Sequence, residues 1–279
     1  SNMIQNYGRQ VVTNPLLNQN GYYTMDYADL DKKAADPATR LLILCSPHNP
    51  VGRVWKREEL EKLVAICKKN HVSIISDEIH CDIIRQTFRH YPLETVAPDY
   101  KTHIFTCTAP SKTFNLAGLQ LSNIIIHDSN VKDSWASYVS SKLGIHNPTP
   151  LSISAVQAAY EEGEDWLQQV NAYIDQNIDF VEKFIADAMP KARFFKAEGT
   201  YLIWIDVKGY GYTNEQVTQM LIDEADVLIE DGKMFGKEGD GYIRLNVACP
   251  RILLEEGLRR IARTLEHPGS DSAARKSRA

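Results

Sequence analysis

Side chains that could do chemistry follow several apolar runs of this sequence, at the points where predicted strands end. The four of most interest are Asn49, Asp77, Lys112 and Arg244. Because ligands of open parallel sheets bind at the carboxyl ends of the strands, we expect these side chains to share one crevice. An amide, a carboxylate, an amine and a guanidinium would then face the same ligand.

The pairing of Lys112 with Asp77 indicates one kind of cofactor chemistry. A lysine amine at a strand end can form a Schiff base with pyridoxal phosphate, and a nearby carboxylate can keep the ring nitrogen of that cofactor protonated. Each residue alone is weak evidence, because a single lysine is usually solvated and a single aspartate often caps a helix. The four residues in this order favour the functional interpretation.

Short apolar runs alternate with segments of helical period in the first half of the chain. The predicted strands are residues 10–13, 40–45, 72–76, 103–107 and 123–126. Their continuous apolar character is typical of strands buried on both faces, and so of a mainly parallel sheet with helices on both sides. Between two of these runs, Leu60, Leu63, Val64 and Cys67 form one stripe of a helix, which predicts a β-α-β unit.

The second half of the chain has a different pattern of apolar residues. A long helical region is predicted from about Pro150 to Met189, with an interruption near Gly163. The segments after Pro190 predict a smaller unit of mixed strands and helices. Its predicted strands are residues 194–195, 200–205, 227–229 and 242–245, and its predicted helices are residues 215–225 and 253–265.

The sequence therefore predicts an α/β fold, with a mainly parallel sheet and helices on both faces, followed by a smaller α+β C-terminal domain. We expect residues 4–165 to form the large domain and residues 166–267 the small one. Residues 1–3 are interpreted as a tag remnant and a start methionine. Residues 268–279 are nearly free of apolar side chains and predict a mobile tail.

The composition excludes several classes of function. The 279 residues are 43% hydrophobic and 24% charged, and the net charge of -5 gives no basic excess for nucleic acid. No apolar stretch reaches the ~20 residues of a membrane span and no signal pattern opens the chain, so we expect a cytoplasmic protein without a membrane partner. Five cysteines without a CxxC spacing predict reduced, structural thiols and no metal site.

Four segments carry a resemblance to a known family. They are SPHNPVGRVW at 46–55, SDEIHCDI at 76–83, APSKTFNLAGLQLSN at 109–123 and YIRLNVACP at 242–250. In order and spacing they resemble the fold-type I pyridoxal phosphate enzymes of aminotransferase class I/II, and among these the MalY/PatB-type cystathionine β-lyases. The resemblance covers the chain from about Ile4 to Glu266, and DEIH with SKTFNLAGL favours this branch over ordinary aminotransferases.

The resemblance implies a role for each candidate site residue. Lys112 matches the Schiff-base lysine, Asp77 the partner of the ring nitrogen, and Asn49 the amide that hydrogen-bonds the phenolic oxygen of the cofactor. Arg244 matches the arginine that binds the α-carboxylate of the substrate through two parallel hydrogen bonds. Ser111 would contact the cofactor phosphate.

Two positions depart from the pattern of many aminotransferases. His80 stands where those enzymes have a tyrosine, which agrees with the lyase branch, and Ala109 stands where they have a serine that contacts phosphate. His80 is open to two interpretations. It either contacts the edge of the cofactor ring or is a core histidine that supports its own strand end.

The resemblance implies a carbon-sulfur lyase that acts on a small sulfur amino acid. Cystathionine or a related cysteine S-conjugate would give a thiol, pyruvate and ammonia by α,β-elimination, with Lys112 as the base at Cα. An aminotransferase would use the same residues, and a catalytically silent fold that serves as a binding or assembly module is a third alternative. The family also implies a homodimer.

The resemblance begins well inside the sequences of this family. The preceding part would supply a first strand, a helix whose N-terminus binds the cofactor phosphate, and an aromatic residue that stacks on the cofactor ring. We therefore expect residues 1–279 alone to bind pyridoxal phosphate weakly and to lack lyase activity.

Overall fold

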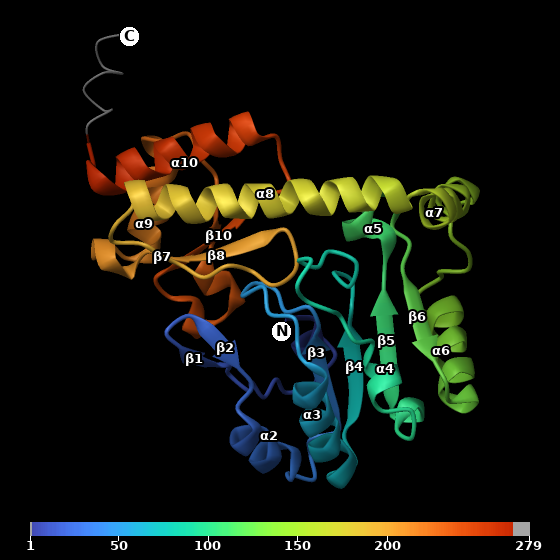
Figure 1. Ribbon diagram of the computed structural model, residues 1–279. Helices are drawn as coiled ribbons and strands as arrows, with labels where there is room; N and C mark the ends of the chain where they lie inside the picture. The colour runs from blue at the N-terminus through green and yellow to red at the C-terminus, as the bar shows by residue number, and fades with distance from the viewer. Residues whose placement is uncertain (1, 270–279) are drawn as a thin grey trace.

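The larger sheet of the computed structural model, which describes residues 2–269, has the strand order β3-β4-β5-β6 (Figure 1). These strands are Leu41–Cys45, Ser73–Asp77, Ile104–Thr108 and Asn123–Ile126. The first three are parallel, and β6 pairs antiparallel to β5. In this register Cys45, Asp77 and Cys107 lie side by side at the carboxyl ends of the parallel strands.

Helices α2 (Tyr27–Ala34), α3 (Arg57–Lys69) and α4 (Leu93–Val96) cover one face of this sheet. Since successive side chains of a strand point to opposite faces, Leu44, Ile74 and Ile104 share that face and are buried in its core. The α3 helix packs there through the apolar stripe that the sequence predicts, and the Glu59 carboxylate accepts a hydrogen bond from the Lys56 N–H, 2.8 Å away, at its start.

The opposite face of the sheet is less covered within the part of the chain that the structure describes. Leu41 and Ile43 on β3 are 47% and 51% exposed, and Ile124 on β6 is also exposed. Asp77 belongs to this same face, because it is in register with Cys45 and lies two residues from Ile75, the partner of Ile43. The apolar side chains of this face therefore border the strand end that carries Asp77.

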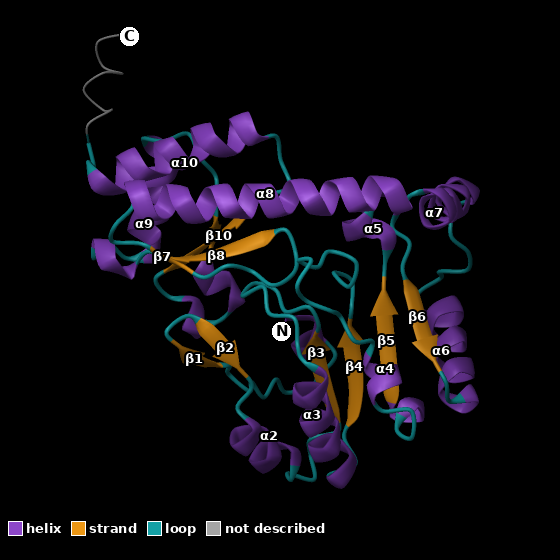
Figure 2. Ribbon diagram, in the orientation of Figure 1, coloured by secondary structure: helices purple, strands orange, loops and turns teal. Residues whose placement is uncertain are grey.

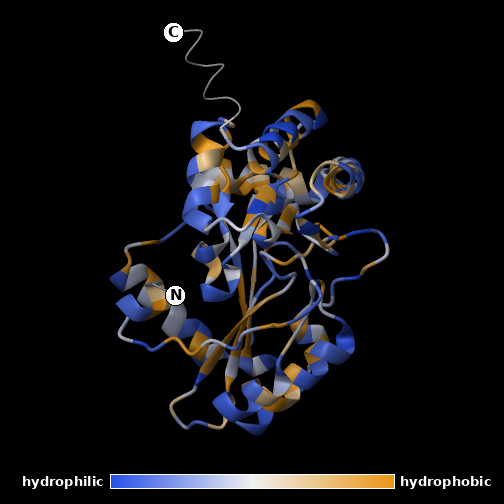
Figure 3. Cartoon of the chain, turned by 90° about the vertical axis from the view of Figure 1, so that its left-hand side faces the viewer, coloured by the Kyte–Doolittle hydropathy of each residue, from blue (hydrophilic) through white to orange (hydrophobic). Residues whose placement is uncertain are grey.

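Helix α8 (Glu164–Ala188) runs above the larger sheet and continues into the second unit (Figures 1 and 2). The sheet of that unit has the antiparallel order β7-β8-β10-β9, formed by Arg193–Phe194, Leu202–Asp206, Tyr242–Asn246 and Glu230–Asp231. Helices α8, α9 (Asn214–Asp223) and α10 (Arg251–Glu266) bury its core, in which Ile178, Ile203 and Leu258 are almost fully enclosed. Figure 3 shows hydrophobic residues gathered along the central strands.

The remaining elements are shorter helices, a two-stranded hairpin and turns. They are α1 (Asn2–Asn6), β1 (Leu17–Gln19), β2 (Tyr22–Thr24), α5 (Pro110–Thr113), α6 (Ser129–Lys142) and α7 (Pro150–Glu162), with 3₁₀ turns at Lys101–His103, Ala117–Leu119, Lys208–Tyr210, Gly232–Phe235 and Lys237–Gly239. No helix among residues 2–269 is both long and apolar enough to span a membrane.

The α/β class, with an incomplete parallel sheet and a smaller α+β unit, is confirmed. The strands predicted at residues 10–13 and 227–229 are wrong, because both segments are irregular. The strands that follow them, β1 and β9, begin only at Leu17 and Glu230. The domain boundary after residue 165 stays a prediction and falls within the first turn of α8. The predicted tag residue Ser1 and residues 270–279 of the predicted tail lie outside the described residues.

We expect Ile43→Thr to reduce self-association of the purified chain, because it removes apolar surface from the exposed face of β3 while keeping a β-branched side chain. Sedimentation velocity over a concentration series measures the effect. Ile252→Thr is the matched control, since Ile252 is 75% exposed but lies on α10. Equal association of both variants and the unmodified chain would contradict the role of the sheet face.

Candidate functional site

The loop that carries Asn49 is fixed by a close contact with the second unit. Gly52 has a φ of +71°, and a Cβ there would lie 2.5 Å from the Cβ of Ala197. The Gly52 carbonyl accepts hydrogen bonds from the N–H groups of Glu198 and Gly199, at 2.8 and 3.0 Å. Glycine is required at this position by both its left-handed backbone and the approach of the other segment.

The next residue, Arg53, reinforces the same contact with a buried ion pair. Its Nε donates to Oε2 of Glu198 at 2.8 Å, and its Nη2 donates to Glu59 at 2.9 Å. The Val54 N–H also donates to Glu198, at 2.8 Å. Because Arg53 is almost fully buried and paired on both sides, the loop has a fixed position between the two units.

Asp77 ends β4, with the thiols of Cys45 and Cys107 as its neighbours on the adjacent strands. Burial raises the pKa of Asp77, as does the nearby charge of Glu78, whereas the Ile79 N–H at 3.3 Å and the charge of Lys112 oppose the shift. The carboxylate is thus poorly stabilised by its own surroundings, and a further cation would stabilise its ionised form.

Glu78, the next residue, points to the other face of the sheet and has a structural role. It is 2% exposed and accepts hydrogen bonds from Ser76 Oγ at 2.7 Å and from the Leu93 N–H at 3.0 Å. His90 Nε2 lies 2.9 Å from its other oxygen. Glu78 is not among the residues predicted from the sequence, although its place beside Asp77 at a strand end is a usable signal.

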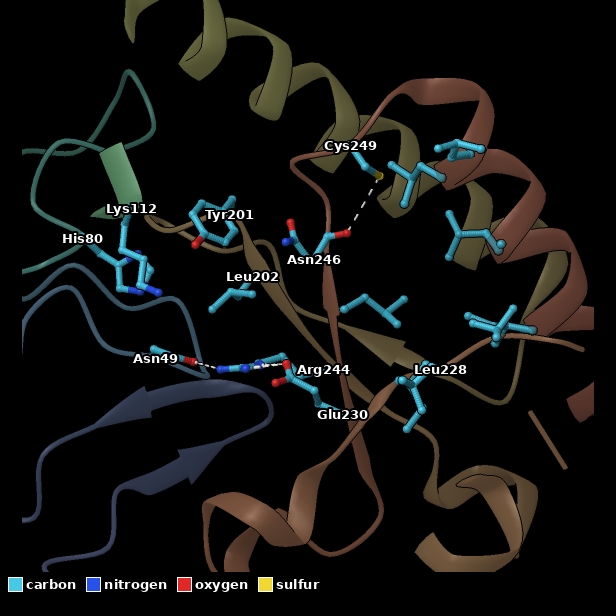
Figure 4. A pocket seen from close by; sticks show the side chains of 18 of the residues that line it. Asn49, His80, Lys112, Tyr201, Leu202, Leu228, Glu230, Arg244, Asn246 and Cys249 are labelled. Atoms are coloured by element: carbon cyan, nitrogen blue, oxygen red, sulfur yellow. Dashed lines mark hydrogen bonds and ion pairs between the residues drawn. The ribbon is translucent and has the colours of Figure 1, made fainter. Parts of the chain in front are cut away.

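Lys112 lies in α5, the short helical turn that follows β5. The turn starts at Pro110, and the Thr113 hydroxyl donates to Asp82 at 2.7 Å, which anchors the turn to the segment after β4. The Lys112 side chain points into a cavity beside His80 (Figure 4). Its charge is close enough to both Asp77 and His80 to influence the pKa of each.

That cavity has a volume of about 650 Å³ and lies between the two units. Four of the six predicted site residues line it: Asn49, His80, Lys112 and Arg244. Asp77 and Ser111 do not line the cavity, although both are close to lining residues in sequence. Its other walls come mainly from apolar residues of the second unit, namely Leu202, Val227, Leu228, Ile229, Leu245, Leu253, Leu254, Leu258 and Ile261.

His80 is buried at the edge of the cavity. Its ring meets the Tyr201 ring edge-on at 5.6 Å, and its Nδ1 has no hydrogen-bond partner among residues 2–269. Burial, followed by the positive charges of Lys112 and Arg244, lowers the pKa of His80 to about 4. The imidazole is therefore neutral near pH 7, and one of its nitrogens is left available.

Arg244 closes the cavity from the β10 side, and its guanidinium has partners at both ends (Figure 4). Its Nη1 donates to Asn49 Oδ1 at 2.6 Å, and its Nε donates to Glu230 Oε2 at 2.5 Å. The Phe235 ring lies beneath it, 4.4 Å from the guanidinium carbon. Tyr201, Glu230 and Phe235 are not predicted from the sequence, because each is placed by the strands or turns of the second sheet.

Within residues 2–269, no group of three or more His, Cys, Asp or Glu side chains is arranged to hold a metal ion. The cysteines of that part of the chain are free thiols, and burial raises the pKa of Cys45 to about 11. Among the described residues, the groups near the cavity that carry charge or can act as nucleophiles include the Lys112 amine, the Asp77 and Glu230 carboxylates, the Arg244 guanidinium and the Cys249 thiol, whose pKa is raised by burial.

Comparison with known proteins agrees with this arrangement. The profile of the family "Aminotransferase class I and II" matches residues 1–261. The chain is 39% identical over 263 residues to cystathionine beta-lyase PatB of Bacillus subtilis, and the match covers 94% of this chain and 68% of PatB.

Solved structures show the same fold. A PLP-bound putative aminotransferase from Clostridium difficile has a TM-score of 0.92 and 41% identity, with 95% of this chain and 68% of that chain covered. A PLP-bound C-S lyase from Staphylococcus hominis has a TM-score of 0.88 and 39% identity, with coverage of 95% and 69%. The chain thus spans about two thirds of the length of these relatives.

The resemblance of the four sequence segments is confirmed by these matches. The profile extends over more than nine tenths of the sequence, and the likeness of structure extends over both units of the fold. The chain belongs to the aminotransferase class I and II family.

Proposed function

We propose that this chain carries the substrate site of a pyridoxal phosphate-dependent carbon-sulfur lyase. The reaction is the α,β-elimination of a cysteine S-conjugate, cystathionine among the candidates, to a thiol, pyruvate and ammonia. One observation carries the proposal: Asn49, Lys112 and Arg244, which come from distant segments, line the same cavity. The likeness to a named cystathionine β-lyase and a named C-S lyase supports the type of reaction.

The residues at the cavity fit pyridoxal phosphate. Lys112 would hold its aldehyde carbon, Asn49 would donate to its phenolic oxygen, and Asp77 would face its ring nitrogen. When bound, the cofactor supplies a ring that accepts the electron pair released at the substrate Cα. The Nδ1 of the buried His80, which has no hydrogen-bond partner in the described part of the chain, supports a polar ligand at this place. A contact of His80 with the cofactor stays a prediction, as does that of Ser111 with the phosphate.

Lys112 is the residue proposed to move the proton. Its Nζ would take the proton from Cα, since it is the lysine that lines the cavity and comes from the turn after a parallel strand. Asp77 would hold a proton at the ring nitrogen. Burial raises the pKa of this carboxyl, so a protonated ring nitrogen is the kind of partner that would stabilise the ionised form of Asp77.

Arg244 is proposed to bind the α-carboxylate of the substrate. A guanidinium can give a carboxylate two parallel hydrogen bonds, which fixes the orientation of Cα relative to a base. Arg244 is held for this task by the Phe235 ring beneath it and by Asn49, whose carbonyl oxygen accepts from Nη1. The homodimer and the cytoplasmic location implied by the resemblance stay predictions.

An aminotransferase is the second candidate, because the Clostridium difficile protein that is 41% identical is described as a putative aminotransferase. Both reactions use the same lysine, aspartate and arginine. They differ in their products, since only the lyase releases pyruvate from a cysteine S-conjugate without a keto-acid acceptor. Pyruvate formation with cystathionine as the sole substrate therefore tests the lyase against the aminotransferase.

The lysine assignment predicts that borohydride reduction in the presence of pyridoxal phosphate will label Lys112. Peptide mapping by mass spectrometry should find the pyridoxyl group on Lys112, and Lys112→Ala should remove it. Lys142→Ala, a lysine at the end of α6, is the control that should leave the label unchanged. A label that persists at another lysine in the Lys112→Ala protein would contradict the assignment.

Asp77→Asn should retain the cofactor but lose roughly a hundredfold in rate, because an amide cannot stabilise a protonated ring nitrogen. Pyruvate release at saturating substrate measures this loss. If residues 1–279 show no turnover, the comparison is made in a chain extended to the full length of its relatives. A rate equal to that of the unmodified protein would show that Asp77 has no role at the ring nitrogen of the cofactor.

Residues 1–279 alone should bind pyridoxal phosphate in the millimolar range and show no lyase activity. The cations that line the cavity within the described residues are Lys112 and Arg244, and Arg244 is already paired, so the phosphate has few donors. Each missing charge-assisted hydrogen bond costs about 1.5–3 kcal/mol, and two or more separate micromolar from millimolar binding. Absorbance titration and a pyruvate assay are the measurements, and micromolar binding with turnover would refute the expectation.

A further inference from the structure

The guanidinium of Arg244, proposed above as the carboxylate site, is already bound to a carboxylate of this chain. Nε donates to Glu230 Oε2 at 2.5 Å, and Nη2 forms an ion pair with the same oxygen. Nη1 is taken by Asn49 Oδ1 at 2.6 Å. Each nitrogen of the guanidinium therefore has a partner, and a ligand carboxylate can use the Nε and Nη2 edge only after Glu230 has left it.

The backbone holds the two residues opposite each other. Glu230 on β9 and Arg244 on β10 are direct partners in the antiparallel ladder. Side chains of such partners lie on the same face of a sheet, about 5 Å apart at their Cβ atoms. The ion pair is thus a consequence of strand register, and Glu230 stays within reach of the guanidinium when its carboxylate swings away.

The two members of the pair differ in how firmly they are held. The Arg244 side chain is 11% exposed and is fixed by the Phe235 ring and by Asn49. The Glu230 side chain is 44% exposed at the rim of the cavity, and Arg244 is its ion-pair partner. A rotation of Glu230 into solvent restores its hydration, whereas a displaced Arg244 would lose several contacts, so Glu230 is the partner that can be exchanged.

We propose that Glu230 is a specificity-determining residue that competes with the α-carboxylate of the substrate for Arg244. This inference rests on the proposed function of Arg244. A ligand whose only contact is its carboxylate replaces one charge-assisted pair by another and gains little binding free energy. The affinity then depends on the other contacts of the ligand. After displacement, the Glu230 charge remains at the rim and disfavours ligands with a second carboxylate near the first.

The substrate class that follows is an amino acid with one carboxylate near the reacting centre and a neutral or cationic side chain. The rest of the cavity agrees with this class, because its walls beyond Arg244 are largely apolar, with Leu228, Leu245 and Leu253 among them. Asp77 is the other carboxylate near the cavity, and Lys112 lies close to it. An acidic side chain would thus meet the negative charge of Glu230 at the rim, and the other cation of the described lining, Lys112, lies close to the negative charge of Asp77.

The test uses the purified chain of residues 1–279 without cofactor and two probes, L-alanine and L-aspartate, which differ by one carboxylate. Binding is followed by calorimetry and by the ¹H–¹⁵N NMR signal of the Arg244 Nε–H group, assigned through Arg244→Lys. We expect Glu230→Gln to bind L-alanine about tenfold more tightly than the unmodified chain, a difference of about 1.4 kcal/mol. The preference for L-alanine over L-aspartate should become smaller in this variant.

Two further variants separate the effect of the Glu230 charge from other effects of a substitution. Glu238→Gln removes the same charge from a nearby turn, where Lys237 is the ion-pair partner, and should leave both affinities unchanged. Glu230→Asp keeps the charge on a shorter side chain, and its affinity for L-alanine should fall between those of the unmodified chain and Glu230→Gln. Circular dichroism melting curves show whether each variant is folded before it is compared.

The outcomes distinguish the inference from the proposed function. If Arg244→Lys abolishes L-alanine binding but Glu230→Gln does not strengthen it, the inference about Glu230 is overturned and the role of Arg244 stands. If Arg244→Lys binds L-alanine as well as the unmodified chain, the proposed carboxylate site itself is wrong. Undetectable binding by both the unmodified chain and Glu230→Gln also overturns the inference, because the uncovered guanidinium should then bind a carboxylate.

Discussion

The buried ion pair between Arg53 and Glu198 is the interaction on which the arrangement of the site depends. It joins the loop after β3 to the segment before β8, and Gly52 brings the two backbones together at the same point. Removal of Arg53 would leave the largely buried Glu198 carboxylate without its cation, at a cost of roughly 3–5 kcal/mol. Asn49 lies only a few residues from this junction, so its contact with Arg244 across the cavity requires the junction to be intact.

The order of elements follows from this constraint. The parallel strands bring Asp77 and Lys112 to one edge of the larger sheet, whereas the antiparallel sheet supplies Arg244 and the apolar walls of the cavity. Among the described residues that line the cavity, the first unit supplies the proposed base, Lys112, and the second supplies the proposed carboxylate-binding group, Arg244. Chemistry at this place therefore depends on how the two units meet, which is why the cavity lies at their junction.

Much of the larger sheet and of the site could be predicted because the signals are local. An apolar run followed by a polar residue is enough to place Asn49 and Lys112 after their strands. The second sheet is harder, since Glu230 reaches the cavity through antiparallel pairing of distant segments and Tyr201 lies just before such a strand, β8. Residues 227–229 have the composition of a strand, but they pair with no neighbouring strand in the described structure. Their apolar side chains line the cavity, so their composition reflects the cavity wall and not a strand.

Adjacent carboxylates show how the structure separates a structural role from a functional one. Glu78 is buried with donors from Ser76 and Leu93 and a close contact to His90, so its charge is already compensated. Asp77 has one weak backbone donor and a pKa raised chiefly by burial, so its charge still requires a partner.

The same distinction applies to the arginines. Arg53 is compensated by partners that are themselves largely buried, whereas the carboxylate beside Arg244 is half-exposed and can leave for solvent. A charge whose partners cannot be exchanged stabilises the fold. A charge that is weakly compensated, or whose partner solvent can take over, is available to a ligand, and Asp77 and Arg244 are examples at this junction.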